Sequence, residues 1–176
     1  DASRMVWRRW AGVRPTGIDR LCLAWHDHYA PRAQAVLVHR RGLHILPMAA
    51  SQTLFRLLDE ETPREQFRRR FVGWAARNLV HLLRPQPGGG RLWLNVGHTG
   101  LNLPGLAEWV SAADLRPVLM LHDIIPITHP EYCREGEKAR HEVRVIASAR
   151  LSLEAAAACA ALRAPSAPGW TGLSRV

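Results

Sequence analysis

Two short apolar runs with a helix-like stretch between them constrain the fold more than any other feature of the chain. Residues 92–96 form the first run, residues 117–121 form the second, and a helical pattern covers residues 104–113 between them. Apolar runs that lack polar alternation are typical of parallel strands buried on both faces. A strand, a helix and a second strand at this spacing are typical of a βαβ unit. We therefore predict an α/β fold with a mostly parallel sheet.

The other elements are predicted from helical periodicity and turn signals. Thr16 and Asp19 have the spacing of a capping box, and Pro15 prevents an earlier helix start. The expected helices cover residues 16–29, 51–61, 63–83 and 135–153, and a hairpin or two edge strands cover residues 33–38 and 43–46. The expected buried faces carry Ile18, Leu21, Trp25 and Tyr29 in the first helix, Phe67, Phe71, Trp74 and Ala75 in the third, and Val143, Ile146 and Arg150 or Leu151 in the last.

The length of the chain, 176 residues, is that of one domain. We expect residues 1–153 to form a Rossmann-like three-layer unit whose first strand lies upstream of Asp1. Residues 154–176 are rich in alanine and proline, and we predict a poorly ordered tail there.

Polar side chains follow both predicted parallel strands. Gly97, His98 and Thr99 come after the first strand, and His122 and Asp123 come after the second. Ligands of open parallel sheets bind beyond the carboxyl ends of the strands, so we expect one shared site at this rim. Two interpretations of the His122–Asp123 pair stay open. The carboxylate could orient the imidazole for proton transfer, or it could accept backbone N–H groups in a turn.

A second candidate site is the start of the helix at Thr16 and Gly17. A helix N-terminus presents unpaired N–H groups and partial positive charge, which suit a phosphate or a sugar hydroxyl. Every capped helix has this property, so the signal is weak.

The charge is strongly basic: 24 Lys and Arg against 15 Asp and Glu give a net charge of +9. Such a surface is compatible with solvated helix faces, with phosphates or an anionic membrane, and with nucleic acid. The nucleic-acid interpretation depends on one predicted helix that carries Arg64, Arg68, Arg69, Arg70 and Arg77.

Metal and disulfide signals are weak in this sequence. The three cysteines lie far apart, which predicts a chain of the reducing cytoplasm. His26 and His28 are two residues apart on a predicted helix and point to different faces, so we expect surface histidines and no metal site.

Three segments together resemble the bacterial family 4 glycosyltransferases. The first is Arg8-Arg9-Trp10 with Arg14-Pro15-Thr16-Gly17-Ile18-Asp19-Arg20, and the second is Leu94-Asn95-Val96-Gly97-His98-Thr99-Gly100-Leu101. The third and most specific is His122-Asp123-Ile124-Ile125-Pro126-Ile127-Thr128-His129-Pro130-Glu131-Tyr132, followed by Gly136-Glu137 and His141. The resemblance covers residues 3–150.

The resemblance implies a GT-B fold, in which two Rossmann-like halves face one another and this chain is the half that takes the acceptor. It implies transfer of a hexose, such as mannose, from a nucleotide-sugar to a lipid-linked or polysaccharide acceptor, with no metal and no cofactor beyond the donor. Thr16 and Gly17 would face the donor phosphates, and His98 would lie near the acceptor. His122 and Asp123 would be catalytic at the cleft floor, with Gly97 and Thr99 beside them.

The family's donor-binding half and its paired glutamates have no counterpart in this sequence. We therefore expect the chain to be inactive alone. It would lie in the cytoplasm, with the anionic inner membrane as a surface it can bind. The alternatives are a basic nucleic-acid-binding module and a truncated gene product without a function of its own.

Overall fold

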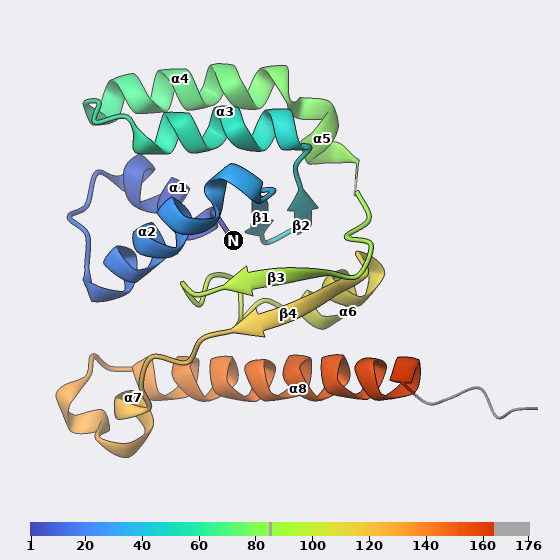
Figure 1. Cartoon of the computed structure of the whole chain (residues 1–176). Coiled ribbons are helices and arrows are strands. Elements are labelled where there is room, and N and C mark those ends of the chain that lie inside the picture. The colour runs from blue at the N-terminus through green and yellow to red at the C-terminus, as the bar shows by residue number, and fades with distance from the viewer. Residues whose placement is uncertain (85, 164–176) are drawn as a thin grey trace, which may run out of the picture.

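The chain has a mixed α/β fold, seen here in a computed structural model that describes residues 1–84 and 86–163. Figure 1 shows α3 and α4 side by side at one end of the molecule and α8 along the other, with the strands between them. The helices are α1 (Ser3–Ala11), α2 (Gly17–Tyr29), α3 (Met48–Asp59), α4 (Arg64–Arg77), α5 (Leu79–Leu83), α6 (Leu106–Ala112), α7 (Ile125–Thr128) and α8 (Glu137–Arg163), with short 3-10 turns at Ala30–Arg32 and Pro130–Tyr132.

The described strands form two separate pairs. β1 (Val36–His39) and β2 (Gly42–Ile45) make the predicted antiparallel hairpin. β3 (Arg91–Asn95) and β4 (Leu115–Leu119) run parallel, with α6 as the crossover, which confirms the predicted βαβ unit. The two pairs do not hydrogen-bond to one another in this structure, so the predicted continuous sheet is not seen.

The loop before β3 holds the start of the parallel pair together. The N–H groups of Gly88 and Gly90 donate to the carbonyls of Ala113 and Asp114, just before β4. A Cβ on Gly88 would lie 2.7 Å from both of these carbonyl oxygens, so no larger residue can make this approach.

Several predicted helix bounds need correction. The sequence pattern does not predict α1, because Met5 is the only buried residue within this helix. The helix predicted over residues 63–83 is broken at Asn78, where the side-chain amide donates to the Trp74 carbonyl at 2.8 Å. α8 extends to Arg163, ten residues past its predicted end at 153. The rest of the predicted tail, residues 164–176, lies outside the described residues.

The buried faces were predicted well for α4 and less well for α2 and α8. Phe67 and Trp74 are buried in α4, as expected. On α8, Val143 and Ile146 are exposed, which contradicts the prediction, because the helix turns His141 and Leu151 toward the rest of the domain. On α2 the fully buried residues are Asp19, Cys22 and His26, while Ile18, Leu21, Trp25 and Tyr29 flank them and are partly buried.

Candidate functional site

The histidines that follow the two parallel strands meet at one rim, as the sequence predicts for parallel strands. The ring centroids of His98 and His122 are 4.7 Å apart. The Nε2 of His98 donates to the carbonyl of Met120 at 2.5 Å, and the Nε2 of His122 donates to the carbonyl of Val96 at 2.6 Å. His98, which follows β3, therefore bonds the residue just after β4, and His122, which follows β4, bonds the residue just after β3.

A third histidine joins this rim from α8. The buried His141 donates from Nε2 to the carbonyl of Asp123 at 2.9 Å, and its ring centroid is 6.3 Å from that of His98. Sequence reasoning did not place His141 among the site residues, although it lies in the segment that carries the resemblance. His141 lies far along the chain from both strands, so no local sequence pattern could predict that it reaches the rim.

The hydrogen bonds fix the tautomers of the three rings. A carbonyl oxygen can only accept, so the Nε2 that faces it must carry the proton. In the neutral form, Nδ1 of each of these rings is then an acceptor. His98 and His122 are partly exposed, so that a hydroxyl group of a ligand can approach them.

Burial favours the neutral form of His98. Desolvation is the largest cause that lowers the pKa of its imidazole, and the charges of His122, Arg144 and His141 lower it further, while the bond to Met120 opposes this shift. The backbone of His98 has φ of 59°, in the left-handed region that side chains other than glycine rarely adopt. Strained backbone of this kind is often found at functional sites.

Asp123 stabilises a turn, which is the second of the two interpretations left open by the sequence. Its Oδ1 accepts the N–H of Ile125 at 3.1 Å at the start of α7, while the ring of His122 bonds the Val96 carbonyl instead. The carboxylate is exposed and thus positions the segment after β4. The alternative, in which Asp123 orients the His122 imidazole, is not the arrangement in this structure.

Arg4 connects the second candidate site to the first. Its Nε donates to Asp19 Oδ1 at 2.6 Å, and its guanidinium also donates to the Gly97 carbonyl at 3.3 Å. Asp19 in turn accepts the N–H and the hydroxyl of Thr16 at 2.6 and 2.7 Å, which confirms the predicted capping box. Thr16 and Gly17 are exposed, so the start of α2 lies one arginine side chain from the histidine rim.

The turn between the strand and His98 is packed too closely for a larger residue at Gly97. A Cβ there would lie 2.7 Å from Arg4 Cδ and 3.2 Å from Cys22 Sγ. Thr99 contributes its backbone carbonyl, which accepts the Asn95 side-chain amide at 2.9 Å. Asn95 is fully buried, so this bond anchors the turn to the end of β3.

The prediction of a surface position is confirmed for His28 and wrong for His26. The His26 side chain is 3% exposed, and its Nε2 bonds Asp59 Oδ1 at 2.7 Å. Donor atoms of His26, Asp27 and Asp59 lie within 4.8 Å of one another, a set that could hold a metal ion. No sequence pattern predicted this set, because Asp59 comes from the end of α3.

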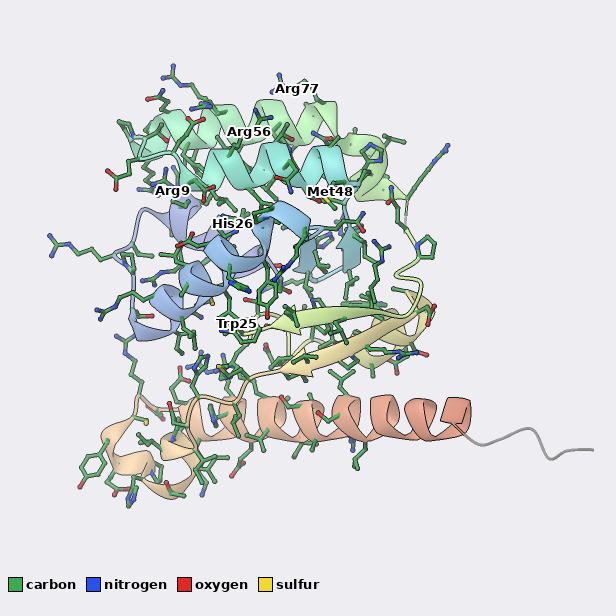
Figure 2. All side chains as sticks on the ribbon, in the orientation of Figure 1. Arg9, Trp25, His26, Met48, Arg56 and Arg77 are labelled. Atoms are coloured by element: carbon green, nitrogen blue, oxygen red, sulfur yellow. The ribbon has the colours of Figure 1, made fainter. Side chains whose placement is uncertain are left out.

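The arginines of α4 divide into two groups. Arg64 and Arg68 donate to the Trp10 carbonyl at 3.1 and 3.0 Å, and Arg70 pairs with Glu60. Arg69 and Arg77 line a groove of about 540 Å³, together with Arg56 of α3 and the Arg70–Glu60 pair. Figure 2 shows Arg56 and Arg77 on these neighbouring helices. Because three of the five arginines already bond to groups of the same chain, the face is less suited to nucleic acid than its sequence suggested.

In the part of the chain that the structure describes, no helix has both the length and the apolar character needed to cross a bilayer. Searches among known proteins found no matching family model, no matching curated protein and no matching solved structure.

Proposed function

We propose that this chain is the acceptor-side half of a glycosyltransferase that moves a hexose from a nucleotide-sugar to a lipid-linked or polysaccharide acceptor. The observation that carries the proposal is the meeting of His98 and His122 at the carboxyl end of a parallel strand pair. This is where α/β sheets bind ligands. The three segments of the resemblance provide the reaction class.

The residues at the rim have the chemistry that an acceptor hydroxyl needs. His98 is neutral near pH 7 because burial lowers the pKa of its imidazole, and its Nδ1 accepts a hydrogen bond. His122 and His141 fix the backbone of the rim by donating to the carbonyls of Val96 and Asp123. In the proposed enzyme His98 therefore positions the hydroxyl, and His122 lies beside the reacting sugar.

Positive charge beside the rim suits a departing diphosphate. Arg144 is near enough to lower the pKa of His98, and Arg4 lies between the rim and the start of α2. Cationic groups and helix N-termini stabilise phosphate charge as it develops in the transition state. In the proposed GT-B arrangement, Thr16 and Gly17 face those phosphates, and a second Rossmann-like half binds most of the nucleotide.

The proposal is tested by measuring how tightly the chain binds donor and acceptor ligands. Calorimetry would titrate GDP-mannose, UDP-glucose and a short-chain prenyl-diphosphate-linked monosaccharide into the protein and into H122A. We expect the prenyl-linked sugar to bind, and H122A to weaken its binding by about tenfold, the value of one lost hydrogen bond.

The matched control is H129A, because His129 is exposed on the same segment and lies outside the rim. This variant should bind like the parent chain. Equal affinity of the parent and H122A for every ligand would contradict the proposal. Tighter binding of random-sequence DNA, with steep salt dependence, would favour the nucleic-acid alternative.

A further inference from the structure

One face of the β3 segment lines a cavity. Successive side chains of a strand point to opposite faces, so Leu92, Leu94 and Val96 lie on the same side of this segment. All three line a cavity of about 590 Å³, whereas Trp93, on the other side, is buried in the core. The wall continues to Arg91, and from there to Val96 it is about 17 Å long at about 3.3 Å per residue. The cavity is therefore long enough for an extended chain.

The other walls of the cavity come from the hairpin and from α1, α2 and α3, and they are also largely apolar. Val36 and Ile45 line the cavity from the hairpin, and the buried residues Met5, Cys22 and Phe55 line it from the three helices. Its volume equals that of about twenty water-sized groups at about 30 Å³ each. A cavity of this size with mostly apolar walls is typical of a small-molecule site.

Exposed residues mark where the cavity opens to solvent. Leu92 is 65% exposed and Met48 is 44% exposed, although both line the cavity. Arg32 and Arg91 are also exposed members of its wall. Figure 2 shows Trp25, another wall residue, between α2 and β3. The cavity thus combines a buried apolar part with an opening that carries guanidinium groups.

The charged groups on the wall leave a net positive charge. Among the described residues, neither Arg32 nor Arg91 forms an ion pair with a carboxylate. The wall also carries the carboxylate of Asp1, whose amino group is mostly neutral at pH 8 because burial lowers its pKa to about 6. Two guanidinium groups and one carboxylate leave one positive charge, which a ligand with one negative charge balances.

Both guanidinium groups keep N–H donors for a ligand. Each guanidinium carries five N–H donors. Arg91 donates to the carbonyls of Pro87 and Gly88, and Arg32 makes a hydrogen bond to Nε2 of His28 at 3.0 Å. A carboxylate can accept two parallel bonds from one guanidinium.

We propose that this cavity binds a long-chain fatty acid. In the complex, the apolar chain lies along Leu92, Leu94 and Val96, where burial removes it from water. The carboxylate bonds Arg32 and Arg91 at the opening. A carboxylate matches the single net charge of the wall better than a phosphate does, because a phosphate monoester carries about 1.5 to 2 negative charges at pH 7.

This inference goes beyond the proposed function, because none of the three histidines of the rim lines the cavity. The experiment is calorimetry at pH 8 with three lipids, each below the concentration at which it forms micelles. Oleate is the fatty acid, oleyl alcohol is its uncharged match, and geranylgeranyl phosphate represents the prenyl phosphates. We expect oleate to bind in a 1:1 complex with a Kd of about 10–100 μM, as ligands of this size do. Oleyl alcohol should bind about tenfold more weakly, because it lacks the charge.

Two variants test the two parts of the site. R32Q/R91Q should bind oleate about tenfold more weakly and oleyl alcohol as the parent does, which shows that the variant still folds. L92E places a carboxylate on the exposed part of the wall and should weaken oleate by about tenfold or more. Its matched control is V118E, because Val118 is 39% exposed on β4 and lies outside the cavity.

Three results would overturn the proposal. The first is no binding of oleate, and the second is equal binding of oleate by the parent, L92E and V118E. The third is tighter binding of geranylgeranyl phosphate than of oleate, which would make a prenyl phosphate the occupant. The variants leave His98 and His122 unchanged, so these results and the failure of the proposed function, which H122A tests, can be distinguished.

Discussion

The imidazoles of His98 and His122 are bonded crosswise, each to the carbonyl of a residue that follows the other's strand, with 4.7 Å between the ring centroids. For this arrangement, β3 and β4 must run parallel and end at the same level. Both conditions are met, because Asn95 and Leu119, the last residues of the two strands, are paired.

The left-handed backbone of His98 gives a first prediction. H98A loses the bond to Met120 and keeps the strained φ of 59°, whereas H98G loses the same bond and relieves the strain. We expect H98G to be more stable than H98A by about 1 kcal/mol, the cost of that conformation for a residue with a Cβ. Urea unfolding monitored by tryptophan fluorescence measures both. Equal stability, or H98A the more stable, would show that the backbone is not strained in solution.

Gly97 gives a second prediction through its contact with Arg4. G97A should lower the free energy of unfolding by about 1–3 kcal/mol, because the new methyl group overlaps Arg4 and Cys22. The matched control is G17A, since a Cβ at Gly17 meets no atom within 4 Å. Its effect should stay within about 0.5 kcal/mol. Thermal unfolding of the two variants measures this difference. Comparable losses of stability in both would contradict the packing described at Gly97.

A third prediction concerns pH. The pKa of the Asp1 ammonium is lowered from 8.0 to about 6, and burial lowers the pKa of His98 and of His44 below 6.5. The unfolded chain therefore binds more protons in these ranges, so these three groups make stability rise with pH up to about 8 and fall as the pH decreases. Between pH 8 and 6 the Asp1 contribution amounts to about 2 kcal/mol.

N-terminal acetylation is the control for that slope. The acetylated chain should lose the slope between pH 8 and 6 and keep the decline below pH 6.5 that His98 and His44 cause. Chemical unfolding at five pH values measures the slope of stability against pH for both chains. An acetylated chain with an unchanged slope would mean that the amino group is solvated.

The arginine groove between α3 and α4 gives a fourth prediction. Arg56, Arg69 and Arg77 should bind vesicles that contain phosphatidylglycerol, with each arginine contributing about 1 kcal/mol near the surface. R56Q/R77Q should therefore sediment with such vesicles several-fold less well than the parent. The control is R64Q, because Arg64 is engaged by the Trp10 carbonyl outside the groove. A larger loss in R64Q than in R56Q/R77Q would move the binding surface elsewhere.

The sequence predicted those parts of the fold that depend on local pattern. The apolar runs at 92–96 and 117–121 predicted the parallel pair, and the hairpin and the capping box at Thr16 and Asp19 were predicted from turn and cap signals. The meeting of His98 and His122 followed from strand direction alone. These features depend on neighbours in the chain or on one pairing rule, so they can be derived without coordinates.

The features that the sequence did not predict depend on contacts between distant segments. His141 reaches the rim because α8 packs along β4, and His26 is buried because Asp59 comes from another helix. Val143 and Ile146 look like a buried face, yet α8 presents a different face to the domain. The break at Asn78 also escaped prediction, because both of its flanks have good helical patterns.

The central claim is that the histidines after β3 and β4 form one ligand site, and imidazole NMR tests it most directly. Nitrogen-15 spectra of the histidine rings would be recorded while a short-chain prenyl-diphosphate-linked monosaccharide is titrated into the chain. We expect shifts at His98, His122 and His141 that saturate together, with no shift at His28 and His129. Saturating shifts at His28 or His129 alone, or no shift at the rim, would contradict it.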